Sequence, residues 1–316
     1  MQKKPRKLHG GDIYRHPDVI DFSVNTNPLG TPESVKRAVQ ESVAKIEHYP
    51  DVRCEALRKA IGRFEQVNME EILCGNGAAE LFFAAVQAVQ PQKALVITPS
   101  FSEYEEAIRS VGAEVEYYYL CEEDNFQIRE DYVDKLSEEI DMIFLCNPNN
   151  PTGVIYSGDT LDQLQKALER AEARIGHPLY VISDEPYREL VYDDNELPFM
   201  PAHVKNCLIV YSFSKSLSLP GERIGYLVIP DEMKDSEEVL AAANVATRIL
   251  GFVNAPTLQQ KVVEKCLNEK TDLSFYNRNR EDLYNGLKEC GFECIKPQGA
   301  FYLFVKSPVA DEKEFC

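Results

Sequence analysis

The sequence predicts an α/β protein with a mostly parallel central sheet flanked by helices. Short runs rich in Val, Ile and Leu alternate with amphipathic helical stretches, which is typical of βαβ units. The predicted strands are Ile72–Cys74, Ala94–Ile97, Glu114–Leu120, Met142–Cys146, Tyr180–Ser183, Leu208–Ser212 and Ile224–Ile229. The helices predicted between them include Ala78–Val89, Ser102–Val111, Arg129–Glu139 and Thr160–Arg174.

The two ends of the chain show a different pattern from its middle. Turn-forming residues fill the first 30 positions, and Thr31-Pro32-Glu33 predicts a helix start with threonine as N-cap. Long helical stretches after Pro230 lead to a predicted strand pair, Glu293–Ile295 and Phe301–Val305. We therefore predict a large domain over residues 31–230, and a small α+β domain built from residues 1–30 and 231–316.

Composition narrows the class of protein. The 316 residues suffice for one large or two smaller domains, and a net charge of −18 disfavours nucleic acid as a partner. Nine scattered cysteines without a CxxC pair predict reduced thiols, with neither a disulfide framework nor a metal site. We recognise no secretory leader and no apolar run long enough to span a bilayer, so we expect a cytoplasmic protein without a membrane partner.

The segment GNGAAE, residues 75–80, follows a predicted strand and opens a helix. Glycine lets a phosphate approach the backbone, and a helix N-terminus offers free N–H groups. Glu80 stands where the dinucleotide fingerprint GxGxxG requires its third glycine, so that motif is not matched. The segment is therefore either a phosphate-binding turn or an ordinary strand-to-helix connection.

Two further motifs directly follow predicted strands. NPNNPTG, residues 147–153, can point the amide of Asn150 into a cleft. SDEPY, residues 183–187, places Asp184 at a strand end, where a buried carboxylate is costly unless a cation pairs with it. Tyr187 can supply a hydroxyl to the same place. A rigid turn and a capping aspartate are the structural alternatives.

The most informative segment is SFSKSLSLPGERIGY, residues 212–226. The amine of Lys215 can bond to a carbonyl, while hydroxyls and an arginine beside it can hold an anion. Ser212 to Lys215 also matches the SxxK motif of penicillin-recognising enzymes, but the accompanying SDN and KTG motifs are absent. Ligands of open α/β sheets bind at strand ends, so these motifs together predict one pocket for a phosphorylated aldehyde.

In combination the motifs resemble the class I/II aminotransferases of fold type I, which use pyridoxal 5′-phosphate. The resemblance implies that Lys215 forms a Schiff base with the cofactor and then moves a proton. It implies that Asp184 pairs with the ring nitrogen, while Asn150 and Tyr187 bond the ring hydroxyl. Phe101 would stack on the ring, with Tyr104 as a second candidate. The phosphate would be held by Gly77, Ala78, Ser212, Ser214 and Arg223.

Two parts of the chain carry further implications of this resemblance. Tyr49, in HYPD, is similar to a tyrosine that reaches a neighbouring subunit's phosphate, which implies a homodimer with shared active sites. The N-terminal part resembles threonine-phosphate decarboxylases and histidinol-phosphate aminotransferases. It implies a substrate site that includes His9, Asn25, Asn27 and Gly30.

The predicted function is a pyridoxal-phosphate-dependent aminotransferase that acts on an amino acid or amino-acid phosphate and a keto acid. A decarboxylase of the threonine-phosphate type, with the same cofactor, is the first alternative. A non-catalytic cofactor-binding protein is the second, because the family's C-terminal arginine for the substrate α-carboxylate has no counterpart before Cys316. On this basis the small domain is expected to be incomplete.

Overall fold

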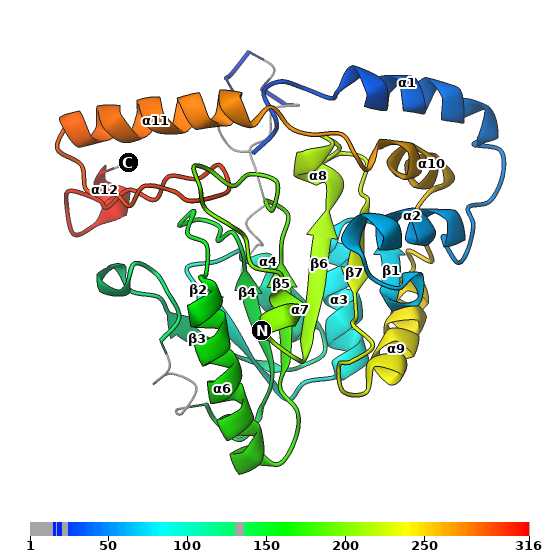
Figure 1. The fold of residues 1–316 in the computed structure, drawn as a ribbon, viewed down its shortest axis with the longest axis horizontal. Coiled ribbons are helices and arrows are strands. Elements are labelled where there is room, and N and C mark those ends of the chain that lie inside the picture. The colour runs from blue at the N-terminus through cyan, green and yellow to red at the C-terminus, as the bar shows by residue number, and fades with distance from the viewer. Residues whose placement is uncertain (1–14, 17, 21–24, 130–135, 316) are drawn as a thin grey trace.

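The computed structural model describes residues 15–16, 18–20, 25–129 and 136–315. A seven-stranded sheet with the order β1-β7-β6-β5-β4-β2-β3 forms its centre (Figure 1). Strand β7 runs antiparallel to both of its neighbours and the other neighbouring pairs are parallel, which confirms the predicted mostly parallel sheet. The strands are β1 Ile72–Gly75, β2 Lys93–Thr98, β3 Glu114–Tyr119, β4 Ile140–Cys146, β5 Tyr180–Asp184, β6 Cys207–Ser212 and β7 Gly225–Val228.

Helices cover both faces of this sheet (Figure 1). The α-helices are α1 Glu33–Ser42, α2 Glu55–Glu65, α3 Ala78–Val89, α4 Glu103–Ser110, α6 Gly158–Ile175, α7 Met200–His203, α8 Phe213–Ser216, α9 Ser236–Ile249, α10 Thr257–Cys266, α11 Leu273–Glu289 and α12 Glu312–Phe315. Short 3₁₀ turns are η1 Val43–Lys45, η2 Met69–Glu71 and η3 Glu122–Asp124.

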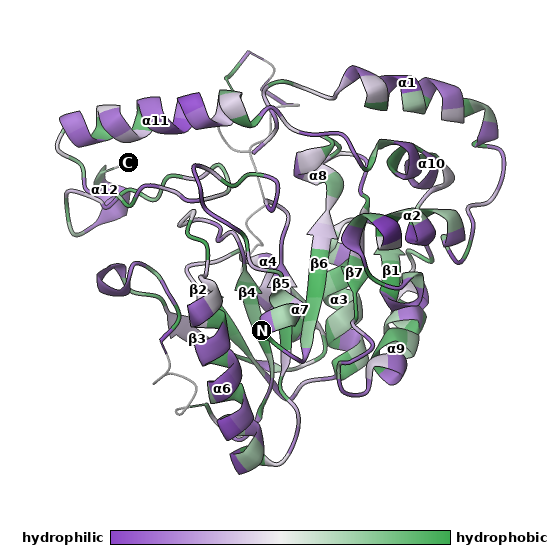
Figure 2. Cartoon of the chain, viewed as in Figure 1, coloured by the Kyte–Doolittle hydropathy of each residue, from purple (hydrophilic) through white to green (hydrophobic). Residues whose placement is uncertain are grey.

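The period-two pattern of the strands divides the core between the two faces. In β4, Met142 and Phe144 pack with residues of α3, α4 and α9. Ile143 and Leu145 point the other way and pack with residues of α6. In Figure 2 the central strands β6 and β7 are mostly hydrophobic, whereas α6 carries many hydrophilic residues.

The register of the strands determines which residues lie together at the C-terminal edge of the sheet. Cys146 of β4 pairs with Asp184 of β5, and Asp184 pairs with Val210 of β6. The C-terminal ends of these strands therefore lie along one edge. Strand β1 is antiparallel to β7, which is antiparallel to β6, so β1 also ends at this edge and the turn before α3 lies there.

The C-terminal part of the chain joins the sheet core through two helices. Val239 and Ala243 of α9 belong to the same hydrophobic cluster as α3, and Val262 and Val263 of α10 pack with α1 and α2. The division into a domain of residues 31–230 and a second domain from both ends stays a prediction.

The predicted strand pair near the C-terminus is wrong. Residues 293–295 and 301–305 share one isolated bridge, Cys294 to Val305. The intervening turn bonds to other parts of the chain instead: Gln298 and Gly299 donate to the carbonyl of Gly153 at 2.8 and 2.9 Å. This attachment directs the segment towards the strand ends and leaves little of it to pair with itself.

Two smaller expectations concern helix ends. Helix α1 begins at Glu33 with Pro32 as its N-cap, one residue later than predicted. The predicted helix Arg129–Glu139 lies mostly outside the described residues, and residues 136–139 are not helical. Within the described part of the chain, no helix is long and apolar enough to cross a bilayer.

Candidate active site

The three motifs after the strands meet at one edge of the sheet. Asp184 is the last residue of β5, Ser212 is the last residue of β6, and the loop of residues 147–153 follows β4. Helix α8 lies directly beyond the end of β6 and carries Lys215 (Figure 1). Parallel pairing of β4, β5 and β6 brings these segments together, although roughly 70 residues separate Cys146 from Lys215 in the sequence.

Asp184 is buried at this edge with one carboxylate oxygen unpaired. Its side chain is 4% exposed, and its Oδ2 accepts a hydrogen bond of 2.6 Å from the Tyr104 hydroxyl. Among the described residues its Oδ1 has no hydrogen-bond partner. Burial raises the pKa of Asp184 to about 7, against the Tyr104 hydrogen bond and with help from the neighbouring Glu185. An unpaired, buried acceptor of this kind suits a cationic N–H donor.

Lys215 is half-buried and its amine faces aromatic rings. Its Nζ donates a hydrogen bond of 2.6 Å to the backbone carbonyl of Asn25. The same atom lies 5.3 Å from the ring centre of Phe301 and 5.9 Å from that of Tyr187. Burial, together with repulsion from Arg223, lowers the pKa of Lys215 to about 8. A substantial fraction of the amine is therefore neutral near physiological pH, and the neutral form is the nucleophile.

Gly77 and Arg223 form a cradle before the first turn of α3. Gly77 has φ +83° and precedes the helix, while Ala78 is the first helical residue. A Cβ on Gly77 would lie 2.5 Å from Nη2 of Arg223, so only glycine lets the guanidinium approach the turn so closely. The exposed Arg223 is fixed by a hydrogen bond of 2.8 Å to the carbonyl of Pro220. The positive end of α3 and a guanidinium thus face the same space, which suits a phosphate.

Glu80 stabilises the turn that contains Gly77 through hydrogen bonds with Asn76. Its buried carboxylate accepts hydrogen bonds from the backbone N–H and the side-chain amide of Asn76, the latter at 2.7 Å. Burial raises the pKa of Glu80. The residue that breaks the dinucleotide fingerprint therefore stabilises the turn itself.

Two serines, Ser212 at the end of β6 and Ser214 in α8, place hydroxyl groups next to each other. The hydroxyls of Ser212 and Ser214 lie 2.8 Å apart, and the Ser212 oxygen accepts a hydrogen bond of 3.3 Å from the Ser214 N–H. Ser212 thereby caps α8 and fixes the turn that carries Lys215. Both hydroxyls belong to the strand end to which the resemblance assigns the phosphate.

Asn150 lies half-buried in a loop that its neighbours hold rigid. The buried Asn147 accepts a hydrogen bond of 3.1 Å from the backbone of Tyr156. Asn149, also buried, accepts from the N–H and hydroxyl of Thr152 at 3.1 and 2.7 Å. The amides of Asn147 and Asn149 thus support the backbone around Asn150, whose assigned role toward the ring hydroxyl stays a prediction.

Tyr187 meets a partner that the sequence analysis missed. Its hydroxyl makes a short hydrogen bond to the hydroxyl of Tyr302, which also accepts a bond of 3.0 Å from the side chain of Asn25. Burial raises the pKa of Tyr302 to about 12, so both phenols stay protonated. The sequence analysis predicts only a strand here, Phe301–Val305, although the aromatic residues of GAFYLF, residues 299–304, also indicate a cluster of rings.

Phe101 and Tyr104 occupy different layers. Phe101 is half-buried and packs edge-on against Tyr104, with ring centres 5.8 Å apart. Tyr104 itself is fully buried between Phe82 and Phe144 and bonds to Asp184. Tyr104 is therefore not placed as an alternative stacking residue, because its ring belongs to the core and its hydroxyl positions the aspartate.

The N-terminal segment reaches the lysine. Asn27 donates 2.6 Å to the hydroxyl of Ser218 and accepts 2.9 Å from Tyr276, which anchors it between the α8 region and α11. Gly30 closes the turn by donating 3.0 Å to the carbonyl of Asn27, with φ +73°. Asn25 and Asn27 thus border the site, while His9 lies outside the described residues. Tyr49 is 97% exposed, and its role at a partner's site stays a prediction.

A second charged cluster, which the sequence analysis did not predict, begins at Glu185, directly after Asp184. The side chain of Arg188, 15% exposed, pairs with Glu65 at 2.6 Å, and its Nε lies 3.7 Å from Glu185. Its guanidinium also lies 4.5 Å from the ring centre of Tyr211, whose hydroxyl bonds to Glu189 at 2.5 Å and to Ser216 at 2.7 Å. The cluster connects α2 and β6 to the turn that carries Lys215. Its sequence signal is the charge alternation in DEPYREL, residues 184–190.

The residues present fit pyridoxal phosphate. The cradle of Gly77 and Arg223 suits its phosphate, and the partly neutral amine of Lys215 suits its aldehyde. The unpaired Oδ1 of Asp184 suits a protonated ring nitrogen. The fold and this site together define a cofactor-dependent α/β enzyme architecture.

The comparisons identify the family. The model of the aminotransferase class I and II family matches residues 17–316, so the chain belongs to this family, whose members depend on pyridoxal phosphate. The threonine-phosphate decarboxylase of Salmonella typhimurium is 35% identical over 234 residues, which are 71% of this chain and 62% of that protein. A histidinol-phosphate aminotransferase of Methanococcus maripaludis is 27% identical over 304 residues, 94% of this chain and 78% of that protein.

Solved structures show the same fold. The crystal structure of an aminotransferase from Eubacterium rectale superimposes with a TM-score of 0.87 and 35% sequence identity, covering 96% of this chain and 80% of that chain. The fold type predicted from the motifs is therefore confirmed. The chain spans 62% of the length of the decarboxylase relative.

Proposed function

We propose that this protein is a pyridoxal-phosphate-dependent aminotransferase that acts on an amino acid or an amino-acid phosphate. The observation that carries the proposal is the half-buried amine of Lys215, with its pKa lowered to about 8, at the same sheet edge as the unpaired Oδ1 of Asp184. A surface lysine would be almost fully protonated, and a buried carboxylate oxygen without a partner is costly unless a ligand supplies the donor.

Each side chain then has a distinct task. When bound, the cofactor supplies an electron-accepting ring that stabilises negative charge at the substrate's α-carbon. Asp184 would hold the proton on the ring nitrogen, and Tyr104 fixes the direction of its carboxylate. The amine of Lys215 would bind the aldehyde group and would also be the base that moves a proton at the substrate's α-carbon.

Other residues bind and orient. Arg223, Ser212, Ser214 and the backbone of Gly77 and Ala78 bind the phosphate, while Asn150 and Tyr187 bond the ring hydroxyl. Phe101 covers one ring face and excludes water from it. Asn25, Asn27 and Gly30, together with His9, border the substrate.

A decarboxylase is the second candidate, and the 35% identity to the Salmonella threonine-phosphate decarboxylase favours it. The same lysine, aspartate and phosphate cradle serve both reactions. The reactions differ in the bond at the α-carbon that is broken, which depends on how the substrate's carboxylate and side chain are held.

The two candidates are separated by loading the protein with pyridoxal phosphate and supplying amino acids and amino-acid phosphates. Conversion of the cofactor to its pyridoxamine form, with release of a keto acid, supports the aminotransferase. Release of carbon dioxide with retention of the aldehyde form supports the decarboxylase. Cofactor binding without either change would leave a non-catalytic binding protein and contradict both.

We also propose a homodimer in the cytoplasm. Exposed apolar side chains gather on two segments that are tied together by hydrogen bonds from Asn254 to Asp51 at 3.1 Å and from Thr257 to His48 at 3.0 Å. They are Val43, Ile46, Tyr49, Val52, Val245, Ile249, Phe252 and Val253. A patch of this kind is typical of a protein–protein interface, and the scattered free cysteines favour a reducing compartment.

The dimer is tested by sedimentation. The protein should sediment as a dimer, and Ile249→Asp should shift it toward the monomer, whereas Glu237→Asp on the same helix should not. If Tyr49 completes the partner's phosphate site, Tyr49→Phe should weaken cofactor binding without changing the dimer. A monomer that binds the cofactor tightly would contradict the proposal.

A further inference from the structure

Two buried free thiols, Cys54 and Cys74, meet behind the phosphate cradle. Cys54 immediately precedes α2 and Cys74 lies in β1, three residues before Gly77. Each side chain is 4% exposed, and the two thiols interact closely enough to shift each other's pKa. The Cys54 thiol also donates a hydrogen bond of 3.6 Å to the carbonyl of Asp51. The two cysteines come from different elements, so their contact depends on the fold and not on sequence spacing.

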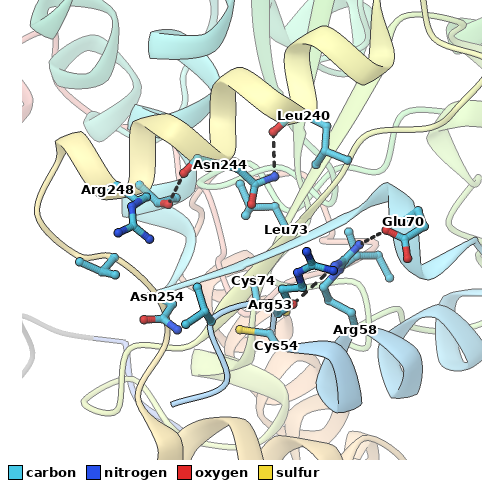
Figure 3. A pocket seen from close by; sticks show the side chains of 14 residues that line it. Arg53, Cys54, Arg58, Glu70, Leu73, Cys74, Leu240, Asn244, Arg248 and Asn254 are labelled. Carbon is cyan, nitrogen blue, oxygen red and sulfur yellow. Dashed lines mark hydrogen bonds and ion pairs between the residues drawn. The ribbon is translucent and has the colours of Figure 1, made fainter. Parts of the chain in front are cut away.

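The pair lies at the wall of a cavity of about 390 Å³. Figure 3 shows Cys54 and Cys74 next to each other, with Arg53 and Arg58 on one side and Arg248 on the other. Arg58 is held by Glu70 at 2.9 Å and by the carbonyl of Met69 at 3.0 Å. Of the three arginines that line the cavity, Arg58 favours negative charge on the Cys54 sulfur, whereas Asp51 opposes it.

The surroundings make the two sulfurs unequal. The hydrogen bond from Cys74, with a contribution from Arg58, lowers the pKa of Cys54 despite its burial and the nearby Asp51. The same hydrogen bond and complete burial raise the pKa of Cys74 well above its usual value. Cys54 is therefore the sulfur that ionises first, and Cys74 keeps its proton.

Other buried cysteines differ in this respect. Burial raises the pKa of Cys146 and Cys207 well above the usual value, whereas the pKa of Cys54 is lowered. All three thiols donate to backbone carbonyls, so that contact does not distinguish them. The thiols of Cys146 and Cys207 are expected to be inert toward oxidants. They provide matched internal controls.

We propose that Cys54 and Cys74 are a dithiol modification site that a peroxide converts to a reversible disulfide, with Cys54 attacking and Cys74 resolving. The Cys54 sulfur bonds to one peroxide oxygen, the O–O bond breaks, and the departing hydroxide takes a proton to become water. The Cys74 sulfur then bonds to Cys54, the S–O bond breaks, and the thiol proton leaves with the hydroxyl as a second water. One peroxide gains two electrons and two thiols lose them.

This site is independent of the proposed enzymatic activity. Val52 and Val253, of the apolar patch assigned to the dimer, also line the cavity, so its mouth lies beside that interface. Hydrogen peroxide is little larger than water and can enter through a narrow opening. Its use as the probe therefore does not require the dimer to dissociate.

The test treats the full chain with hydrogen peroxide and quenches remaining thiols with an alkylating agent. We expect the loss of two hydrogen atoms in the intact mass, a non-reduced peptide pair that joins Cys54 to Cys74, and recovery of both thiols with dithiothreitol. A bridge between other cysteines, or no bridge before the protein unfolds, would overturn the proposal.

Variants separate the two roles. Cys74→Ser should leave a sulfenic acid at Cys54 that dimedone traps, whereas Cys54→Ser should abolish both the bridge and the trapped adduct. Cys146→Ser should oxidise like the unaltered chain. An adduct on Cys74 in the Cys54→Ser protein, equal to that on Cys54 in the converse variant, would refute the assigned order. The peptide map of the unaltered chain decides the bridge itself, even if a variant does not fold.

Discussion

Asp184 and Glu185 are consecutive buried carboxylates, and the pKa of each is raised to about 7 mainly by burial. Their surroundings differ. Asp184 has a phenol on one oxygen and, among the described residues, no hydrogen-bond partner on the other, whereas Glu185 has the Ser183 hydroxyl at 2.9 Å and the guanidinium of Arg188 at 3.7 Å. The first carboxylate is therefore open to a cation from a ligand, while the second has a cation from its own chain.

The two carboxylates differ because successive residues of a strand point to opposite faces. Asp184 shares a face with Ile182 and meets Tyr104 of α4. Glu185 points to the other face, toward Arg188 and Glu65 of α2. One strand end therefore presents one carboxylate to the proposed ligand site and the other to the cluster that attaches α2.

The largest effect should come from removing the amine that faces the ligand region. Lys215→Ala should abolish covalent attachment of pyridoxal phosphate, because this amine is the one proposed to bind the aldehyde and lies at the same sheet edge as Arg223 and Asp184. The measurement is intact mass after borohydride reduction, which should show the cofactor adduct only in the unaltered protein. Lys205→Ala, an exposed lysine paired with Glu169, should keep the adduct. An adduct that survives in Lys215→Ala would place the site elsewhere.

Removing the built-in cation should instead affect stability. Arg188→Met should lower the free energy of unfolding by roughly 3–5 kcal/mol, because Glu65 and Glu185 would remain buried without it. Lys265→Met removes an exposed pair with Glu41 and should cost about 0–1 kcal/mol. Urea unfolding of the cofactor-free proteins measures both. Equal losses would show that the buried cluster is not a separate stabilising unit.

The ligand-facing carboxylate should affect rate more than stability. Asp184→Asn should reduce kcat by roughly 10²–10³-fold, because a neutral amide no longer holds a proton on the ring nitrogen. Glu185→Gln should leave kcat close to that of the unaltered enzyme, since its oxygens face the arginine and not the ligand. Steady-state kinetics on the cofactor-loaded proteins checks the pair. Similar losses in both variants would erase the distinction between the two regions.

The sequence predicted the ligand-facing region better than the buried cluster. Strand positions follow from apolar runs, and parallel topology then forces the strand ends to one edge, so Asp184 and Lys215 could be brought together without coordinates. Which face each residue occupies, and what lies opposite, could not be derived. The bonds from Tyr104 to Asp184 and from Tyr187 to Tyr302 span 80 and 115 residues.

The failed strand pair has a similar cause. Residues 301–305 are apolar enough to predict a strand, but their backbone begins in a turn that bonds to Gly153 and Leu190. Such long-range attachment overrides local β propensity. The same attachment places Phe301 and Tyr302 beside Lys215, a role that composition alone did not indicate.

The smallest effect concerns pH, and it separates the two carboxylates by their response to the cofactor. A carboxyl whose pKa is raised to about 7 on folding stays protonated in the folded chain while the unfolded chain ionises from about pH 4 upward. The folded state then binds more protons, so the free energy of unfolding falls as pH rises from about 4 to 7, by at most roughly 1.4 kcal/mol per unit for one group. Above pH 7 this contribution is constant.

Asp184→Asn and Glu185→Gln should each make this decrease of the unfolding free energy with pH less steep in the cofactor-free protein. Urea unfolding from roughly pH 4.5 to 8 measures it, because that range covers most of the interval between the unfolded and the folded pKa. Saturating pyridoxal phosphate should remove only the contribution of Asp184 to this pH dependence. A cation at its unpaired Oδ1 lowers the pKa of Asp184, while Glu185 keeps its existing environment. With the cofactor bound, Glu185→Gln should therefore still flatten the slope and Asp184→Asn should not. Equal flattening by both variants under those conditions would mean that the cofactor supplies no cation to Asp184.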